Sequence, residues 1–278
     1  MNEQNGYPGV KQAIIMVLKV LGLQIFFGLV LEVLSNTLGL NIGLHPSSIA
    51  VVNSAAFGIV FLLVKKKINV PWREIFPLKP ISLPLLVAIL LAVPGEAILC
   101  SELDSLTRYL LPVPKFFEEF IVDFAKACAN SLWGGILLLI LVAPLTEELM
   151  FRGIIMGGFL KRYSNWKAIL VSSILFACLH VNPWQFITPL LLGILCGWFF
   201  LRTRSLVPCL IAHAVLNTLA IVGMTVSVQS DRNSSGANQL TQVQFQPIWL
   251  DAFGVVLLGV GIWLFKKYSC DIKCDNNS

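Results

Sequence analysis

The feature that most constrains this chain is a series of apolar stretches of about the length of a membrane-spanning helix. Such a helix needs about 20 mostly apolar residues. Only 13% of the 278 residues are charged, about half the usual share in soluble domains. The sequence therefore predicts an all-α, polytopic integral membrane helical bundle, a single membrane domain over residues 1–278. We expect about eight transmembrane helices, the fifth and sixth of them short: 12–34, 47–64, 81–100, 131–160, 167–181, 186–201, 206–225 and 248–265.

The distribution of Lys and Arg predicts the orientation of the bundle. With the N-terminus placed in the cytoplasm, the inner segments hold fourteen of the twenty Lys and Arg and the outer segments hold four. Because positive residues gather on the cytoplasmic side, we expect both termini there. The net charge of +5 then reflects topology, and no nucleic-acid partner is expected. Membrane lipid is the expected surrounding, and the short chain favours a prokaryotic plasma membrane.

Two polar stretches interrupt the apolar pattern. Residues 101–130 are mixed, and the sequence PKFFEEFIVDFAKACANSL within them has apolar residues at helical spacing, which predicts an amphipathic helix at the membrane interface. Residues 226–246 are polar without periodicity, which predicts an exposed loop.

The stretch APLTEELMFRG at 143–153 places three charges inside an apolar segment. Ionisable residues in membrane helices cost at least ~2.5 kcal/mol each at the centre of the bilayer, and they tend to be functional. Glu148 and Arg152 are four residues apart, so they share a helix face and can form an ion pair. Glu147 points about 100° away, free to face something else. Pro144 removes a backbone donor and can kink the helix.

Two further polar clusters lie in later apolar segments: FACLH, which ends at His180, and HAVLN, which contains His213 and Asn217. On converging helices, these groups and the glutamates would form one site suited to hydrolysis by activated water. A glutamate or histidine can take the proton of water, and a histidine and an asparagine can donate to an oxyanion. No serine or cysteine stands at a matching position, which disfavours a covalent nucleophile.

Each of these side chains also has a structural interpretation. Glu148 and Arg152 could form only a bridge within the helix, and either histidine could simply hydrogen-bond a neighbour. Asn217 alone is typical of contacts between membrane helices. Glu147 is harder to explain in this way because it has no local partner of opposite charge. Zinc bound by Glu147, His180 and His213 is an alternative, since one Glu and two His form a catalytic ligand set, although the usual HExxH is absent.

The motifs EExxxR, FxxxH and HxxxN, in this order on successive apolar segments, resemble the CaaX protease and bacteriocin-processing (CPBP or Abi) family of intramembrane endopeptidases. The best-known members remove the last three residues of prenylated proteins. The resemblance covers about residues 131–220, which it marks as the catalytic core.

This resemblance implies a role for each motif residue. Glu147 and His180 would hold and activate the attacking water, and His213 and Asn217 would form the oxyanion site. Glu148 and Arg152 match supporting positions. The family has been described both as metal-dependent and as a metal-free glutamate peptidase. We favour the metal-free form, with no cofactor, because Asn217 suits an oxyanion better than zinc.

The sequence thus predicts an intramembrane endopeptidase with a polar, water-filled cavity open toward the cytoplasm. Its substrate would be a peptide or lipidated protein, and C-terminal processing of prenylated CaaX proteins is one candidate. The alternatives are a non-catalytic bacteriocin-immunity or binding protein on the same scaffold, and a small proton-coupled transporter. A carrier often shows inverted repeats, and none is evident here. The physiological substrate, metal dependence, compartment and oligomeric state are not readable from the sequence.

Overall fold

The computed structural model describes residues 7–39, 42, 45–68, 70–233 and 243–274, and within these ranges every regular element is a helix. The elements that span or cap the bundle are α1 (Val10–Leu38), α2 (Pro46–Lys65), α3 (Trp72–Ile75), α4 (Leu83–Leu110), α5 (Lys115–Asn130), α9 (Asn165–Leu179), η4 (Pro183–Gln185), α10 (Ile187–Thr203), α11 (Val207–Asn233) and α12 (Ile248–Cys274). Residues 132–159 form a composite helix of five pieces: α6 (Leu132–Gly135), η2 (Ile136–Val142), α7 (Ala143–Glu148), η3 (Leu149–Met156) and α8 (Gly157–Phe159).

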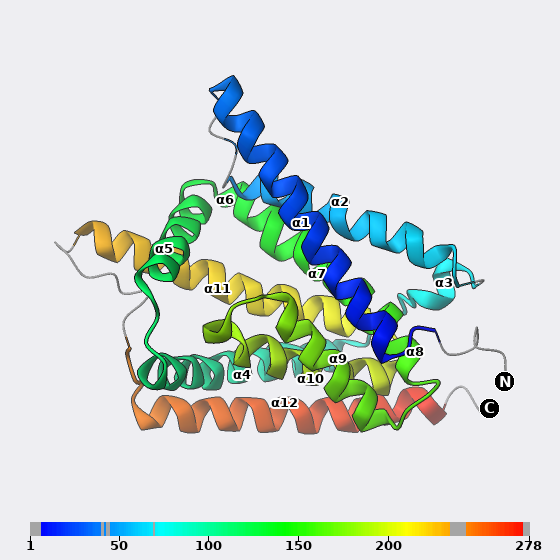
Figure 1. Cartoon of the computed structure of the whole chain (residues 1–278). Helices are drawn as coiled ribbons and strands as arrows, with labels where there is room; N and C mark the ends of the chain where they lie inside the picture. Colours follow the sequence, from blue (N-terminus) through cyan, green and yellow to red (C-terminus); the bar gives the residue numbers. More distant parts are fainter. Residues whose placement is uncertain (1–6, 40–41, 43–44, 69, 234–242, 275–278) are drawn as a thin grey trace.

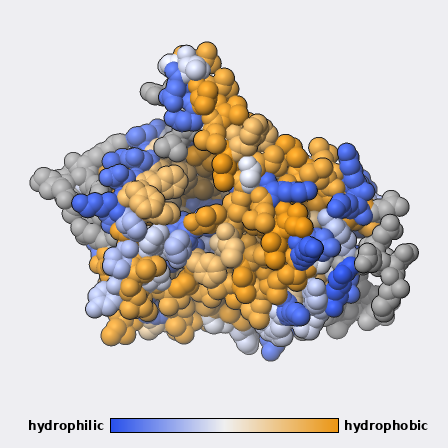
Figure 2. All heavy atoms as spheres, viewed as in Figure 1, coloured by the Kyte–Doolittle hydropathy of each residue, from blue (hydrophilic) through white to orange (hydrophobic). Residues whose placement is uncertain are grey.

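The predicted helical membrane bundle is confirmed. Seven helices are long and apolar enough to cross a membrane, and α9 is a shorter apolar helix of 15 residues. The start of α1 and the end of α12 lie at the same end of the bundle (Figure 1). Hydrophilic residues gather at the two ends of the visible face, and a broad apolar band lies between them (Figure 2). This distribution is the one expected where hydrocarbon surrounds the middle of the molecule.

Helices α4 and α12 pack along most of their length because small residues let the two backbones approach. A Cβ atom added to Gly261 would lie 2.5 Å from the backbone nitrogen of Ala92, and one added to Gly95 would lie 2.5 Å from that of Leu258. Association of helices in lipid depends on such close packing, since lipid tails are as apolar as the side chains. This pair forms a rigid wall of the bundle.

Two helices run further than the hydropathy pattern predicts. Helix α4 continues into the mixed segment and ends at Leu110, just before Pro112 and Pro114, which cannot continue a helix. Helix α11 extends to Asn233, so the expectation of a loop from residue 226 is wrong over its first eight residues. No Gly or Pro interrupts 224–233, and an existing helix gains one hydrogen bond for each residue it adds. Residues 234–242 of the predicted loop lie outside the described residues.

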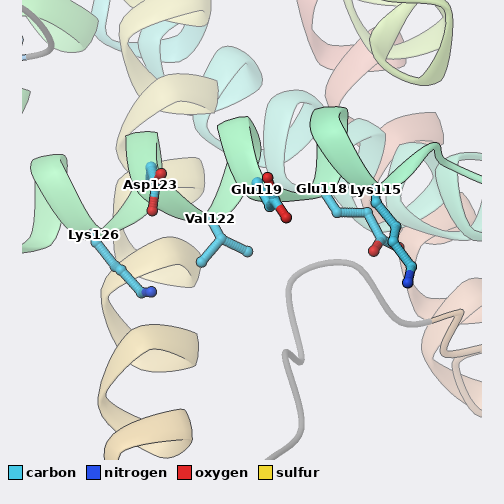
Figure 3. Close-up of a pocket in the computed structure, with 6 residues that line it drawn as sticks. All are labelled: Lys115, Glu118, Glu119, Val122, Asp123 and Lys126. Carbon is cyan, nitrogen blue, oxygen red and sulfur yellow. The ribbon is translucent and has the colours of Figure 1, made fainter.

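Helix α5 is the predicted amphipathic helix. It buries Val122, Ala125 and Cys128 against the bundle, and burial raises the pKa of the Cys128 thiol to about 11. Its charged side chains, together with Val122, line a hollow of about 340 Å³ (Figure 3). The side chains labelled there are Lys115, Glu118, Glu119, Val122, Asp123 and Lys126.

The composite helix that carries the glutamates is π-helical on both sides of Pro144. In the first π-helical stretch the N–H of Ala143 donates to the carbonyl of Leu138, five residues back. By the same pattern, residue 144 would donate to Leu139, but proline has no N–H. The carbonyl of Leu139 is therefore left free by its own helix. π-Helical turns within α-helices are frequently found at functional sites.

Candidate active site

An ion pair buried between three helices forms the base of the site. The Nη1 atom of Arg152 donates to Oε1 of Glu148 at 3.1 Å, so the predicted pair is present, with relative exposures of 1% and 0%. Nη2 of Arg152 donates to the carbonyl of Gly193 on α10 at 3.1 Å. That carbonyl can approach because Gly193 packs on Ser173 of α9, where an added Cβ would lie 2.8 Å from the Cβ of Ser173. The pair thus ties the composite helix to α10.

His213 on α11 lies between the two glutamates. Its Nδ1 is 2.9 Å from Oε1 of Glu148, and its Nε2 is 3.9 Å from Oε2 of Glu147. Because Glu148 is ionised by its pairing with Arg152, it can only accept, and Nδ1 of His213 must carry the proton. The Nε2 atom is then left facing Glu147. The two adjacent glutamates therefore have different surroundings, as their angular separation predicts.

The charges of this cluster balance only with one additional proton. With both carboxylates ionised, Glu147, Glu148 and Arg152 carry a net charge of −1, and a neutral His213 adds nothing. Burying an uncompensated charge is costly, so one proton shared by Glu147 and His213 brings the cluster to neutrality. Oε2 of Glu147 is buried and accepts no hydrogen bond within the described part of the chain.

The ring of Phe176 joins the second histidine to the cluster. Arg152 stacks over this ring at 4.7 Å, and the rings of His180 and His213 contact it edge-on at 5.3 and 5.7 Å between centroids. His180 stands at the end of α9, where its Nδ1 lies 3.1 Å from the carbonyl of Phe176. A carbonyl only accepts, so Nδ1 of His180 donates and its Nε2 is an acceptor.

His180 is exposed, whereas Glu147 and His213 are buried. The next residue, Val181, has a φ of 49°, which is unusual for a β-branched residue. This left-handed turn ends α9 directly after the histidine. Strained backbone of this kind gathers at functional sites.

Asn217 lies one turn from His213 on α11, and it is held by the composite helix. Its Nδ2 donates at 2.7 Å to the carbonyl of Leu139, the carbonyl that Pro144 leaves free. The contact between helices that the residue type suggests is therefore present. The second Nδ2 hydrogen remains for another acceptor, and an oxyanion role for Asn217 stays a prediction.

A row of polar side chains that the sequence analysis missed reaches the site from the first two helices. Gln24 on α1 donates to Oδ1 of Asn53 on α2 at 2.7 Å, and Asn53 donates to Thr146 at 3.3 Å. Thr146 directly precedes Glu147. Gln24 and Asn53 also line a hollow of about 330 Å³ between α1 and α2. An amide in an apolar segment at 24 and another at 53 were the signals available in the sequence.

The zinc alternative stays untested, and its three residues, Glu147, His180 and His213, are not among the compact groups of possible ligand atoms in the described residues. Within the described residues, the compact group of possible ligand atoms is Glu148, Cys196 and Cys209, whose atoms lie within 4.8 Å of one another. Glu147, His180 and His213 form no such group. Glu148 is itself bound to the Arg152 guanidinium, which places a positive charge where a cation would have to sit. We therefore derive no step through a metal.

The predicted cavity at the site stays a prediction. The hollow between α1 and α2 reaches Asn53 but is not lined by Glu147, His180 or His213, and the hollow on α5 lies away from them. A third hollow, of about 490 Å³, lies beside the continuation of the composite helix after Arg152.

The fold and these polar groups define a class: a polytopic membrane protein with a carboxylate–imidazole cluster buried between its helices. Residues 129–219 match the family model described as type II CAAX prenyl endopeptidase Rce1-like. This match includes all three motifs and confirms the resemblance that they predict. The match to this model covers about a third of the chain.

Three relatives are similar over parts of the chain. "Putative membrane peptidase YdiL" of Bacillus subtilis (strain 168) is 27% identical over 30% of this chain and 34% of its own length. "UPF0177 protein YxdF" of Lactococcus lactis subsp. lactis (strain IL1403) is 33% identical over 28% of this chain and 42% of its own. An "Uncharacterized 24.3 kDa protein" of Escherichia coli is 26% identical over 59% and 73%. The chain thus spans less than half of the first two relatives. No solved structure gives a significant match.

Proposed function

We propose that this protein is an intramembrane peptidase in which Glu147 is the general base that activates water. The observation that carries the proposal is the gap of 3.9 Å between Oε2 of Glu147 and Nε2 of His213. This separation is too long for a hydrogen bond but lets one water molecule bond both atoms. Oε2 has no other partner among the described residues. The match to an Rce1-like model and the printed name of the Bacillus relative support the same activity.

The proposed reaction starts with the shared proton on His213 and with Glu147 ionised. Glu147 takes a proton from the water as its oxygen attacks the carbonyl carbon of the substrate. The protonated Nε2 of His213 donates to the oxyanion that forms. Glu147 then passes its proton to the leaving amine, so that one water and one peptide bond become an acid and an amine. Glu148 holds the imidazole in place through Nδ1, as the third member of a triad does.

His180 and Asn217 retain the roles that the resemblance implies. Nε2 of His180 is an acceptor on the exposed side of the cluster, suited to a second contact with the water. The remaining amide hydrogen of Asn217 is suited to the oxyanion. Prenylated CaaX C-termini are the proposed substrate class because the family model is described by that activity.

The test is cleavage of a quenched fluorescent farnesylated CaaX peptide by the purified protein in detergent. We expect Glu147→Gln to lower kcat by about 10²–10⁴-fold, the usual contribution of a general base. Glu119→Gln makes the same chemical change on the exposed face of α5 and should leave the rate unchanged. Cleavage that survives a strong zinc chelator would support the metal-free reaction, and loss of cleavage would support the zinc alternative.

The same assay separates the remaining alternatives. Cleavage of the peptide with and without its farnesyl group at equal rates would show that prenylation is not recognised. No cleavage of any peptide by the wild type would favour an immunity or binding protein. Proton uptake by reconstituted vesicles that Glu147→Gln removes would favour a carrier.

A further inference from the structure

The third hollow has an apolar floor and a positively charged rim. It measures about 490 Å³ and lies between the N-terminal segment, the segment around α3, the end of the composite helix and the end of α10. Its floor includes Ile75, Ile154 and Phe200, and its rim carries Lys79, Lys161 and Arg204. Figure 1 shows α3 and α8 at the end of the bundle where α1 starts. The charge distribution predicts that this end faces the cytoplasm.

Two hydrogen bonds hold the backbone at Lys79 against the backbone that follows Arg204. The hydroxyl of Ser205, which is 1% exposed, donates to the carbonyl of Lys79 at 2.7 Å. The N–H of Leu206 donates to the carbonyl of Pro77 at 2.8 Å. Arg204 ends α10 with a φ of 50°, a conformation that side chains other than glycine rarely adopt. The backbone is therefore strained at Arg204, one of the three cationic residues of the rim.

The positive charge of the rim is not balanced locally. No ion pair joins Lys79, Lys161 or Arg204 to a carboxylate within the described ranges. Glu74 also lines the hollow, which leaves a net charge of +2 on the lining. An anion bound at the rim would relieve the repulsion among these cations.

The hollow also has empty space at its wall. A Cβ added to Gly157 would meet only the carbonyl of Arg152, at an ordinary contact distance of 3.7 Å. Gly153 and Gly158, by contrast, face Phe76 and Pro8 at less than 3 Å. The wall at Gly157 is therefore open on the side of the hollow.

We propose that this hollow binds an anionic phospholipid, with its phosphate on the cationic rim and the start of an acyl chain on the apolar floor. A phosphate fits because Lys and Arg bind it through charge-assisted hydrogen bonds. A lipid is favoured over a soluble anion because the site combines this rim with an apolar floor at the predicted interface, where basic pockets between helices bind anionic head groups. The site is separate from Glu147 and does not depend on the proposed peptidase activity.

The test is native mass spectrometry of the full chain with phosphatidylglycerol or phosphatidylcholine of equal acyl chains. We expect phosphatidylglycerol to be retained preferentially. The triple variant Lys79→Gln, Lys161→Gln, Arg204→Gln should lower its retention by about tenfold or more, because each charge-assisted hydrogen bond to the phosphate within the hollow contributes severalfold. The control Lys66→Gln, Arg73→Gln, Lys266→Gln removes the same charge from exposed positions outside the hollow and should have little effect.

A second variant tests the hollow without changing any charge. Gly157→Leu fills the open space and should displace phosphatidylglycerol, whereas Gly259→Leu, on an open face of α12, should not. Equal retention of the two lipids, equal loss in the two triple variants, or full retention by Gly157→Leu would overturn the proposal. If inorganic phosphate competes as well as a short-chain phosphatidylglycerol, the site is for phosphate and not for lipid, which also overturns it.

Discussion

At the scale of single residues, the main feature of the site is that two neighbouring carboxylates have different hydrogen-bond partners. Glu148 accepts from both Arg152 and His213, whereas Oε2 of Glu147 accepts from neither. The helix achieves this by geometry alone, because adjacent residues point about 100° apart. Glu148 is thus held in the buried ion pair, and Glu147 remains available for a catalytic role.

This division predicts a specific pattern of stability changes. Glu148→Gln leaves the Arg152 guanidinium buried without its counter-charge, which should cost about 3–5 kcal/mol. The double variant Glu148→Gln, Arg152→Met removes both charges and should recover much of that loss. Unfolding by a denaturing detergent, followed by circular dichroism, measures both. A double variant that is as unstable as the single one would show that the pair is not the source of the loss.

The motif spacing predicted the Glu148–Arg152 pair, but not its partners. Spacing within one helix fixes which side chains share a face, so the pair at positions i and i+4 could be foreseen. The contacts of His213 with Glu147 and Glu148 depend on how α11 crosses the composite helix, which no local pattern encodes. The row from Gln24 to Thr146 was missed for the same reason, since its members are isolated in sequence.

At the scale of elements, Pro144 accounts for one hydrogen bond between α11 and the composite helix. It frees the Leu139 carbonyl, and Asn217 on α11 satisfies it. Asn217→Leu should therefore cost about 1–2 kcal/mol, because a carbonyl is left unpaired in an apolar surrounding. In a Pro144→Ala background the same change should cost less, since residue 144 then has an N–H of its own.

A double-mutant cycle on detergent-induced unfolding measures this coupling, which should be about 1 kcal/mol. Purely additive changes would show that Asn217 and Pro144 do not act on the same carbonyl. Peptide cleavage by the Asn217→Leu, Pro144→Ala variant then isolates any catalytic role of the amide, because the structural role has been replaced.

The α4–α12 wall offers a second prediction at this scale. Gly261→Ala brings a Cβ to within 2.5 Å of the Ala92 nitrogen and 2.7 Å of the Ala88 carbonyl, which should force the helices apart and cost about 1–3 kcal/mol. Gly259→Ala meets nothing within 4 Å and should be neutral or stabilising by up to about 1 kcal/mol. Melting temperatures of the two variants in detergent test the difference. Equal melting temperatures would contradict the close packing.

At the scale of the whole molecule, the arrangement of polar ends predicts which residues share a side of the membrane. Lys66 follows α2 at the end where α1 starts, and Glu119 lies on α5, at the other end (Figure 1). In a background without native cysteines, Glu119→Cys should react with an impermeant maleimide on intact cells. Lys66→Cys should react only after permeabilisation. Labelling of both on intact cells, or the reverse pattern, would contradict the predicted orientation.

Much of the fold was predictable because hydropathy directly encodes it. Each predicted apolar segment corresponds to a helix, including the short segment 167–181, which matches α9. The errors lie at helix ends, as in α11, where a helix continues into polar sequence without a Gly or Pro to stop it. The π-helical turns around Pro144 were not predictable, because the hydrogen bond that Asn217 of α11 donates to the Leu139 carbonyl depends on how the helices pack.

Most of helix α1 is not covered by the rest of the bundle. Of its 29 residues only Ala13, Met16, Val17, Val20 and Ser35 are buried, and its length of about 44 Å exceeds the ~30 Å hydrocarbon core, so it must incline to fit. In water, separating such a helix from its neighbour would expose apolar surface at great cost. In a bilayer the uncovered surface meets acyl chains instead, and no hydrophobic penalty opposes the movement. Side-chain packing and the Gln24–Asn53 hydrogen bond are therefore what chiefly resist the separation of α1 from α2. Both residues line the hollow between these helices. Asn53 also donates to Thr146, the residue before Glu147, so a separation of α1 from α2 would open a region next to the candidate site.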